Sequence, residues 1–168
     1  MSEFVGRTGS NRLYSYPDTR RSGNPLTVFA RNFATGPKNQ QDISGGGVQI
    51  LWNAIDVGTS SADVPIAPRS TGIVLVSGVV SIQNQSGFAI PGGASVSVQV
   101  NNGAALIPSG AAAPLADQEI VTIPFLVEVT GLTVGTTYNI EIFVSGDTAT
   151  LLAEASSVDV QEVSVATG

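Results

Sequence analysis

Short runs of alternating apolar and polar residues, separated by turn formers, restrict this sequence to an all-β fold. In the clearest run, residues 94–100, valines alternate with Ser and Gln, so that one face of the strand is apolar and the other polar. Asn101-Asn102-Gly103 follows directly. Asn and Gly tolerate the positive φ angles of tight hairpin turns. A strand that ends in a β turn is therefore predicted here.

Similar segments continue to the end of the sequence, and none has the period of an amphipathic helix. The predicted strands are residues 48–55, 72–85, 94–100, 119–130, 137–145, 148–153 and 157–165, with an edge-like segment around Pro65 and Pro68. Residues 108–118 are predicted to be a loop because Pro and Gly interrupt them. About eight short strands with turn signals between them predict an antiparallel β-sandwich or jelly roll.

The first 44 residues differ from the rest in charge and pattern. They contain six basic residues against three acidic ones, a net charge of +3, whereas residues 45–168 contain one basic residue against ten acidic ones, a net charge of −9. The first segment has no lasting period and is punctuated by Gly, Asn and Pro. We therefore predict an extended basic and aromatic N-terminal arm, residues 1–44, ahead of one β-sandwich domain, residues 45–168.

The predicted arm also holds five of the ten aromatic residues, although disordered tails are usually poor in them. Arg and Tyr are enriched where proteins bind other proteins, and an acidic domain repels polyanions. A protein partner is therefore favoured over nucleic acid, and residues 26–29 are a candidate strand for a neighbour's sheet. The candidate partner-binding residues are Arg7, Arg12, Tyr14, Tyr16, Arg20, Arg21, Phe29, Arg31 and Phe33.

Composition argues against catalysis. The sequence contains neither Cys nor His, which removes disulfides, thiolate metal sites and the usual base that activates a nucleophile. Carboxylate pairs such as Asp117 with Glu119 or Glu154 with Asp159 keep a glycosidase-like mechanism open. Acidic residues scattered over turns and strand edges form such pairs by chance, however. We expect a protein that is not an enzyme, with no catalytic residue, metal or cofactor.

The low charge content favours an oligomer. Only 12% of the residues are charged, whereas fully solvated surfaces usually carry more. A monomer covered with Ser, Thr, Asn and Gln is the alternative. The first residues are polar, and every apolar stretch is shorter than a bilayer requires. Neither a cleaved secretion signal nor contact with a membrane is expected.

Residues 131–142 read Gly-Leu-Thr-Val-Gly-Thr-Thr-Tyr-Asn-Ile-Glu-Ile, and a Gly-Asp hairpin and the strand Ser-Val-Asp-Val-Gln-Glu-Val follow. This part of the chain resembles the second half of the C1q/TNF-like jelly rolls found in trimeric virion proteins. In strand count and spacing the resemblance covers roughly residues 48–165, but in residue pattern it covers only residues 131–163. The Leu-x-x-Gly-x-x-Tyr spacing also resembles the tyrosine corner of fibronectin-III and immunoglobulin-like sandwiches, but the domain length favours the jelly roll.

The resemblance implies a homotrimer. With the basic arm ahead of it, the chain is similar to the cement or decoration proteins on the capsids of tailed bacteriophages. Such a protein is made in the host cytoplasm, attaches through its arm to the major capsid protein on the outside of the shell, and stabilises the virion. The alternative function is a phage fibre or receptor- or carbohydrate-binding head that uses loops near Trp52, Phe88 and residues 108–118.

Overall fold

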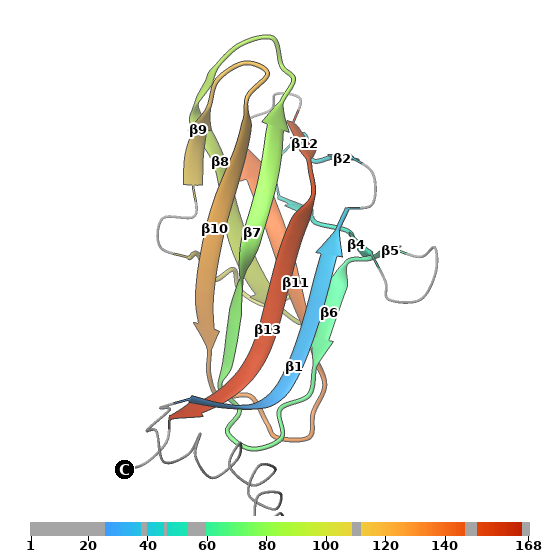
Figure 1. Cartoon of the computed structure of the whole chain (residues 1–168), viewed down its shortest axis with the longest axis vertical. Coiled ribbons are helices and arrows are strands. Elements are labelled where there is room, and N and C mark those ends of the chain that lie inside the picture. Colours follow the sequence, from blue (N-terminus) through green and yellow to red (C-terminus); the bar gives the residue numbers. More distant parts are fainter. Residues whose placement is uncertain are drawn as a thin grey trace, which may run out of the picture.

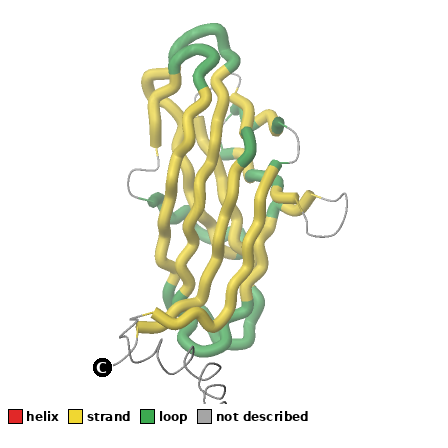
Figure 2. The backbone as a smooth tube through the Cα atoms, in the orientation of Figure 1, coloured by secondary structure: helices red, strands yellow, loops and turns green. Residues whose placement is uncertain are grey.

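The structure, a computed structural model, describes residues 26–37, 40–45, 47–53, 60–108, 112–146 and 151–165. All regular secondary structure within these ranges is β-strand (Figures 1 and 2). The strands are β1 (Leu26–Gly36), β2 (Gln41–Asp42), β3 (Val48–Gln49), β4 (Trp52–Asn53), β5 (Ser60–Ser61), β6 (Asp63–Ile66), β7 (Val74–Asn84), β8 (Ile90–Val100), β9 (Ala112–Leu115), β10 (Ile120–Val129), β11 (Tyr138–Gly146), β12 (Leu151–Ala153) and β13 (Ser156–Val165).

Two antiparallel sheets face each other. In the larger sheet β1 pairs with β13, β13 with β7, and β7 with β10, while the short strands β12 and β2 lie at the end of β7 beyond β13. In the smaller sheet β9 pairs with β8 and β8 with β11, and the other side of β11 pairs with both β3 and β6. Neighbouring strands thus come from distant parts of the sequence, as in a jelly roll. The predicted all-β sandwich is confirmed.

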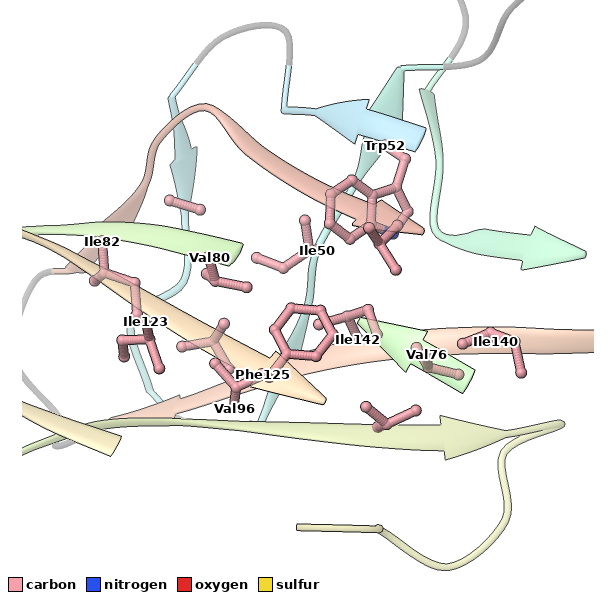
Figure 3. Close-up of a cluster of buried hydrophobic side chains, with 14 of the residues drawn as sticks. Ile50, Trp52, Val76, Val80, Ile82, Val96, Ile123, Phe125, Ile140 and Ile142 are labelled. Carbon is pink, nitrogen blue, oxygen red and sulfur yellow. The ribbon is translucent and has the colours of Figure 1, made fainter. Parts of the chain in front are cut away.

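The core lies between the sheets and consists mainly of Val and Ile. Inward-facing residues alternate with outward-facing ones along each strand, which fits the pleat of a β-strand. The fully buried side chains include Val76, Val80 and Ile82 of β7, Val96 of β8, Ile123 of β10, and Ile140 and Ile142 of β11 (Figure 3). Trp52 is only 1% exposed and lies in the same cluster. It is therefore a core residue and not an exposed loop aromatic that a receptor would contact.

Most predicted strands match observed ones, and the predicted turn is present. The segments 72–85, 119–130, 137–145 and 157–165 correspond to β7, β10, β11 and β13. Asn101 and Asn102 have φ angles of 49° and 56°, as the turn requires. The predicted loop 108–118 contains β9, however. Pro114 is compatible with this strand because β9 pairs with β8 alone and so lies at a sheet edge.

The second half of the predicted arm belongs to the sandwich. β1 pairs with β13 from Leu26 opposite Val165 to Gly36 opposite Ser156, with one irregularity in register. Ile43, just after β2, is fully buried. Residues 1–25 lie outside the described residues.

A buried carboxylate fastens the loop between β6 and β7, which lies at the lower end of the sandwich in Figure 1. Glu162 of β13 is fully buried and accepts hydrogen bonds from the backbone N–H groups of Arg69 (2.6 Å), Ser70 (2.8 Å), Thr71 (2.7 Å) and Gly72 (3.2 Å). Burial raises the pKa of Glu162, but the four backbone donors lower it by more, to about 2. The side chain is therefore an ionised anchor for the loop between β6 and β7.

A tyrosine ties a second loop to the same end. The Tyr138 hydroxyl accepts a hydrogen bond from the backbone N–H of Thr133 at 3.0 Å, which lowers the pKa of Tyr138. In the same loop, the N–H of Leu132 donates to the carbonyl of Gly72, and that of Gly135 donates to the carbonyl of Pro68. The tyrosine thus acts as a tyrosine corner does, and the two backbone hydrogen bonds join the β10–β11 loop to the β6–β7 loop.

Candidate protein-binding surface

β1 and β6 close one side of the sandwich. β1 is the edge strand of the larger sheet and pairs with β13 alone, and β6 is an edge strand of the smaller sheet and pairs with β11 alone. The two strands lie side by side (Figure 1), and the Nδ2 atom of Asn32 donates to the carbonyl of Pro65 at 2.6 Å. Pro65 has no N–H group, so an edge strand tolerates it.

The structure brings two of the predicted partner-binding residues together on β1. Arg31 and Phe33 are both exposed, and because they are two positions apart they lie on the same face of the strand. The Phe33 side chain is 50% exposed, which is high for a large aromatic residue. Phe29 lies in β1, but its side chain is not described. The other predicted residues, Arg7, Arg12, Tyr14, Tyr16, Arg20 and Arg21, lie outside the described residues.

A two-point ion pair holds Arg31 against the sheet. The Nε and Nη2 atoms of Arg31 donate to Oδ1 and Oδ2 of Asp159 at 2.9 and 2.6 Å, and Gln161 donates to Oδ2 as well. These hydrogen bonds raise the pKa of Arg31 and lower that of Asp159. Nη1 of Arg31 has no acceptor among the described residues. The guanidinium is thus fixed in place but still able to donate.

A groove of about 340 Å³ runs between the two edges, with residues of β1, β6 and the β6–β7 loop in its lining. The lining consists of Ala30, Arg31, Asn32, Pro65, Ile66, Ala67 and Arg69. Arg31 and Arg69 are the two basic residues in the described part of the chain, where acidic residues far outnumber them. Arg69 is the one basic residue after residue 44, but its sequence neighbours carry no binding motif that would mark it.

An apolar strip lies on the outer face of β10, the other edge of the larger sheet. Leu126 is 62% and Ile120 56% exposed, and Pro124 between them is exposed as well, whereas Ile123 and Phe125 point into the core. We call Ile120, Pro124 and Leu126 the β10 strip. Exposed apolar residues grouped in this way are typical of interaction surfaces.

One exposed aromatic ring belongs to the loop between β7 and β8, which lies at the upper end of the sandwich in Figure 1. Phe88 is 57% exposed and follows β7 in a loop that Asn84 holds, because the buried Asn84 side chain donates to the carbonyls of Phe88 and Ala116. A second groove of about 300 Å³ lies elsewhere, lined by Gly92, Gly93, Ser95, Ser145 and Gly146. It contains no aromatic side chain.

The acidic residues that were candidates for a glycosidase-like mechanism make hydrogen bonds that stabilise the fold. Asp117 accepts the N–H of Gly87, and Glu119 accepts the N–H of Ala116, so both stabilise loops. Glu154 accepts a hydrogen bond from Gln40. Among the described residues, no group of three or more acidic side chains is placed to hold a metal ion, and no helix is long and apolar enough to cross a membrane.

No protein-family model and no curated protein matches this sequence. Among solved structures, that of infectious bursal disease virus, Gx strain, is similar at 16% identity with a TM-score of 0.43. The match covers 87% of this chain and 38% of the virus chain, so this chain spans well under half of the virus chain's length.

Two further similar structures come from unrelated sources. The carbohydrate-binding module CBM6cm-2 from Cellvibrio mixtus lichenase 5A, solved with cellotriose, is 15% identical with a TM-score of 0.35, over 81% of this chain and 98% of the module. Murine APRIL is 14% identical with a TM-score of 0.35, over 79% of this chain and 99% of that chain. At these identities and TM-scores the similarities assign no function to this chain.

Proposed function

We propose that this chain is a non-enzymatic structural protein of a virion, a cement or decoration protein that attaches to the outside of a capsid and stabilises the shell. The observation that carries the proposal is β1. The basic, aromatic residues 1–25 lead directly into this strand, which presents Arg31 and Phe33 at the edge of the sheet. Arg and aromatic side chains dominate the binding energy of protein interfaces.

The pairing of β1 with β13 gives the proposed arm a firm anchor. The chain enters β1 at Leu26, opposite Val165, and the pairing with β13 continues to Gly36. Residues 1–25 are thus joined in sequence to a strand that is paired along its whole length. The anchor therefore suits a protein that fastens subunits of a shell.

The proposal includes self-association as a homotrimer, with the major capsid protein as the second partner. The β10 strip supports it, because Ile120 and Leu126 are mostly exposed on a single chain and would be covered between copies. Three arms on one trimer raise each other's effective concentration at the shell, so weak single contacts give durable attachment.

The test is a deletion of residues 1–25 followed by co-sedimentation with capsids. The deletion must stop before Leu26, because removing residues 26–44 would also remove β1, β2 and the buried Ile43. We expect a folded protein, judged by its circular dichroism and thermal unfolding, that no longer sediments with capsids. Undiminished sedimentation of a folded deletion variant would exclude attachment through the arm.

The alternative is a fibre or receptor-binding head, and Phe88 is the observation that favours it. Its exposed ring stands on a loop that Asn84 fixes, as a receptor contact would require. Sugar-binding sites usually add aromatic stacking surfaces, but the second groove has none and Trp52 is buried. Binding of the arm-deleted protein to a glycan array, lost in Phe88→Ala, would support the alternative function.

A further inference from the structure

We propose that the groove between β1 and β6 binds the side-chain carboxylates of an acidic segment of a partner protein. The inference rests on the proposed function and deepens it, because it names the chemistry of a partner at the β1 surface. The groove is the place where Arg31 and Arg69 come together on an otherwise acidic domain.

Arg69 has the properties of a preorganised ligand-binding residue. Its backbone N–H donates to the buried Glu162 carboxylate at 2.6 Å, so the main chain at this position is fixed. Its side chain is exposed and has no hydrogen bond or ion pair with the described residues. A guanidinium on a fixed backbone loses less freedom on binding than one on a mobile loop, and it matches the planar fork of a carboxylate.

Arg31 supplies a second, oriented donor group. Asp159 occupies the Nε and Nη2 atoms and thereby holds the guanidinium, while Nη1 remains available. The surface of the groove is mostly polar, and the small side chains of Ala30 and Ala67 leave space in it. A Glu side chain that enters the groove would bring its carboxylate to the guanidinium groups.

The charge distribution favours a short acidic segment over a long polyanion as the ligand of the groove. Nucleic acid gains affinity from many phosphate contacts along a basic surface. The described surface offers two basic residues at one groove, surrounded by acidic residues that repel a polyanion elsewhere. A groove of about 340 Å³ also lies near the small end of the range for ligand pockets. Both features fit one or two carboxylates carried by an extended peptide.

The experiment measures binding of a fluorescein-labelled hexaglutamate peptide to the full chain by fluorescence polarisation at low salt. We expect binding that weakens with added salt, and a roughly fivefold higher Kd in Arg69→Gln, as for the loss of one exposed charge pair. Because the Arg69 side chain has no partner among the described residues, the variant should keep the thermal stability of the parent.

The matched control is Lys38→Gln, which removes one positive charge from a residue that is not in the lining of the groove. If the groove recognises the peptide, this variant binds within about twofold of the parent; equal weakening in both variants would mean general attraction to basic residues and would overturn the proposal. Amide NMR shifts on titration should move at Ala30, Asn32 and Ala67. Shifts confined to other strands would also overturn it.

Two further outcomes separate the possible explanations. Displacement of the peptide by an equal concentration of inorganic phosphate would mean a small-anion site and overturn the docking of an acidic segment. A chain that sediments with capsids but does not bind hexaglutamate would overturn the groove proposal alone. A chain that binds hexaglutamate at the groove but not capsids would overturn the proposed function and leave the groove assignment standing.

Discussion

The Glu162 carboxylate fastens the loop between β6 and β7 more strongly than any apolar residue at that position would. It is fully buried and accepts four backbone N–H groups from residues 69–72. Buried donors that lose a charged acceptor are costly, because no water replaces it. Residues 69–72 include Arg69 of the groove, so this carboxylate also positions a residue of the proposed binding site.

We predict that Glu162→Gln lowers the free energy of unfolding by about 2–3 kcal/mol, measured by urea denaturation. The amide has the same shape as the carboxylate but turns an NH₂ group toward N–H donors, which leaves some of them without an acceptor. The control is Glu128→Gln, which removes an exposed acidic side chain from β10 and should change the free energy by less than about 0.5 kcal/mol. Equal effects in the two variants would contradict the anchoring role.

The same residue makes stability depend on acid pH. The pKa of Glu162 is lowered from its ordinary 4.5 to about 2 in the folded chain, so its stabilising contribution is present above pH 4.5 and is lost as the pH falls toward 2. We therefore expect the difference in unfolding free energy between the parent and Glu162→Gln to shrink across this window. Denaturant titrations at several pH values measure it, and a constant difference would refute this assignment.

Gly72 is required by a close approach as well as by its backbone angle. Its φ is +66°, and a Cβ atom there would lie 2.0 Å from the carbonyl oxygen of Leu132. Gly135 has a similar φ of +84° but open space around it. We predict that Gly72→Ala destabilises the protein by at least about 2 kcal/mol more than Gly135→Ala, measured by thermal or urea unfolding. Similar losses of stability in the two variants would show that the positive φ, and not the close approach to Leu132, determines the cost.

At the scale of elements, the sequence predicts the strands whose side chains alternate in polarity. β7, β10, β11 and β13 carry mostly Val or Ile at their inward, alternating positions, which is the pattern that sequence periodicity detects. β1 does not follow it. Small or polar residues such as Ala30 and Asn32 face inward, whereas the large apolar Phe33 faces solvent. The sequence therefore predicts a strand only over residues 26–29, as an addition to a neighbour's sheet, whereas the whole of β1 pairs with β13 of the same chain.

The candidate surface was only partly predictable for a related reason. Arg31 and Phe33 belong to a basic, aromatic segment whose composition marks it for binding. Arg69 stands alone in an acidic, strand-rich region, and only the crossing from β6 to β7 brings it to Arg31. Arg31 and Arg69 are 38 positions apart in the sequence. Their proximity depends on the topology of the fold, which local composition does not encode.

We predict that Phe33→Ala weakens capsid binding and leaves the unfolding midpoint nearly unchanged. The ring is half exposed, so its removal costs little packing in the free protein, whereas aromatic rings contribute strongly when a partner covers them. Co-sedimentation gives the binding and differential scanning calorimetry the midpoint. The control is Phe88→Ala, a similarly exposed ring in the loop between β7 and β8, which should leave capsid binding intact. The reverse result would favour the receptor-binding alternative.

At the scale of the whole molecule, the two edges of the larger sheet differ in chemistry. The β1 edge carries Arg31 and borders the groove, whereas the β10 edge carries the β10 strip and no basic residue. Apolar side chains on an edge strand invite association with another copy. Pro124 interrupts the free hydrogen-bonding edge of β10, so the expected contact is between side chains and not a continued sheet. Such a contact buries the strip and leaves β1 free for the shell.

The prediction at this scale is that Leu126→Asp converts a homotrimer into monomers. A charged side chain at the centre of a buried apolar contact must be desolvated without a partner, which few oligomers tolerate. Light scattering coupled to size exclusion measures the mass. Ile107→Asp is the control, because Ile107 is 70% exposed but lies outside the strip, and this variant should remain trimeric. A parent chain that is monomeric at micromolar concentration, or a trimer that survives Leu126→Asp, would mean that the β10 strip serves another partner.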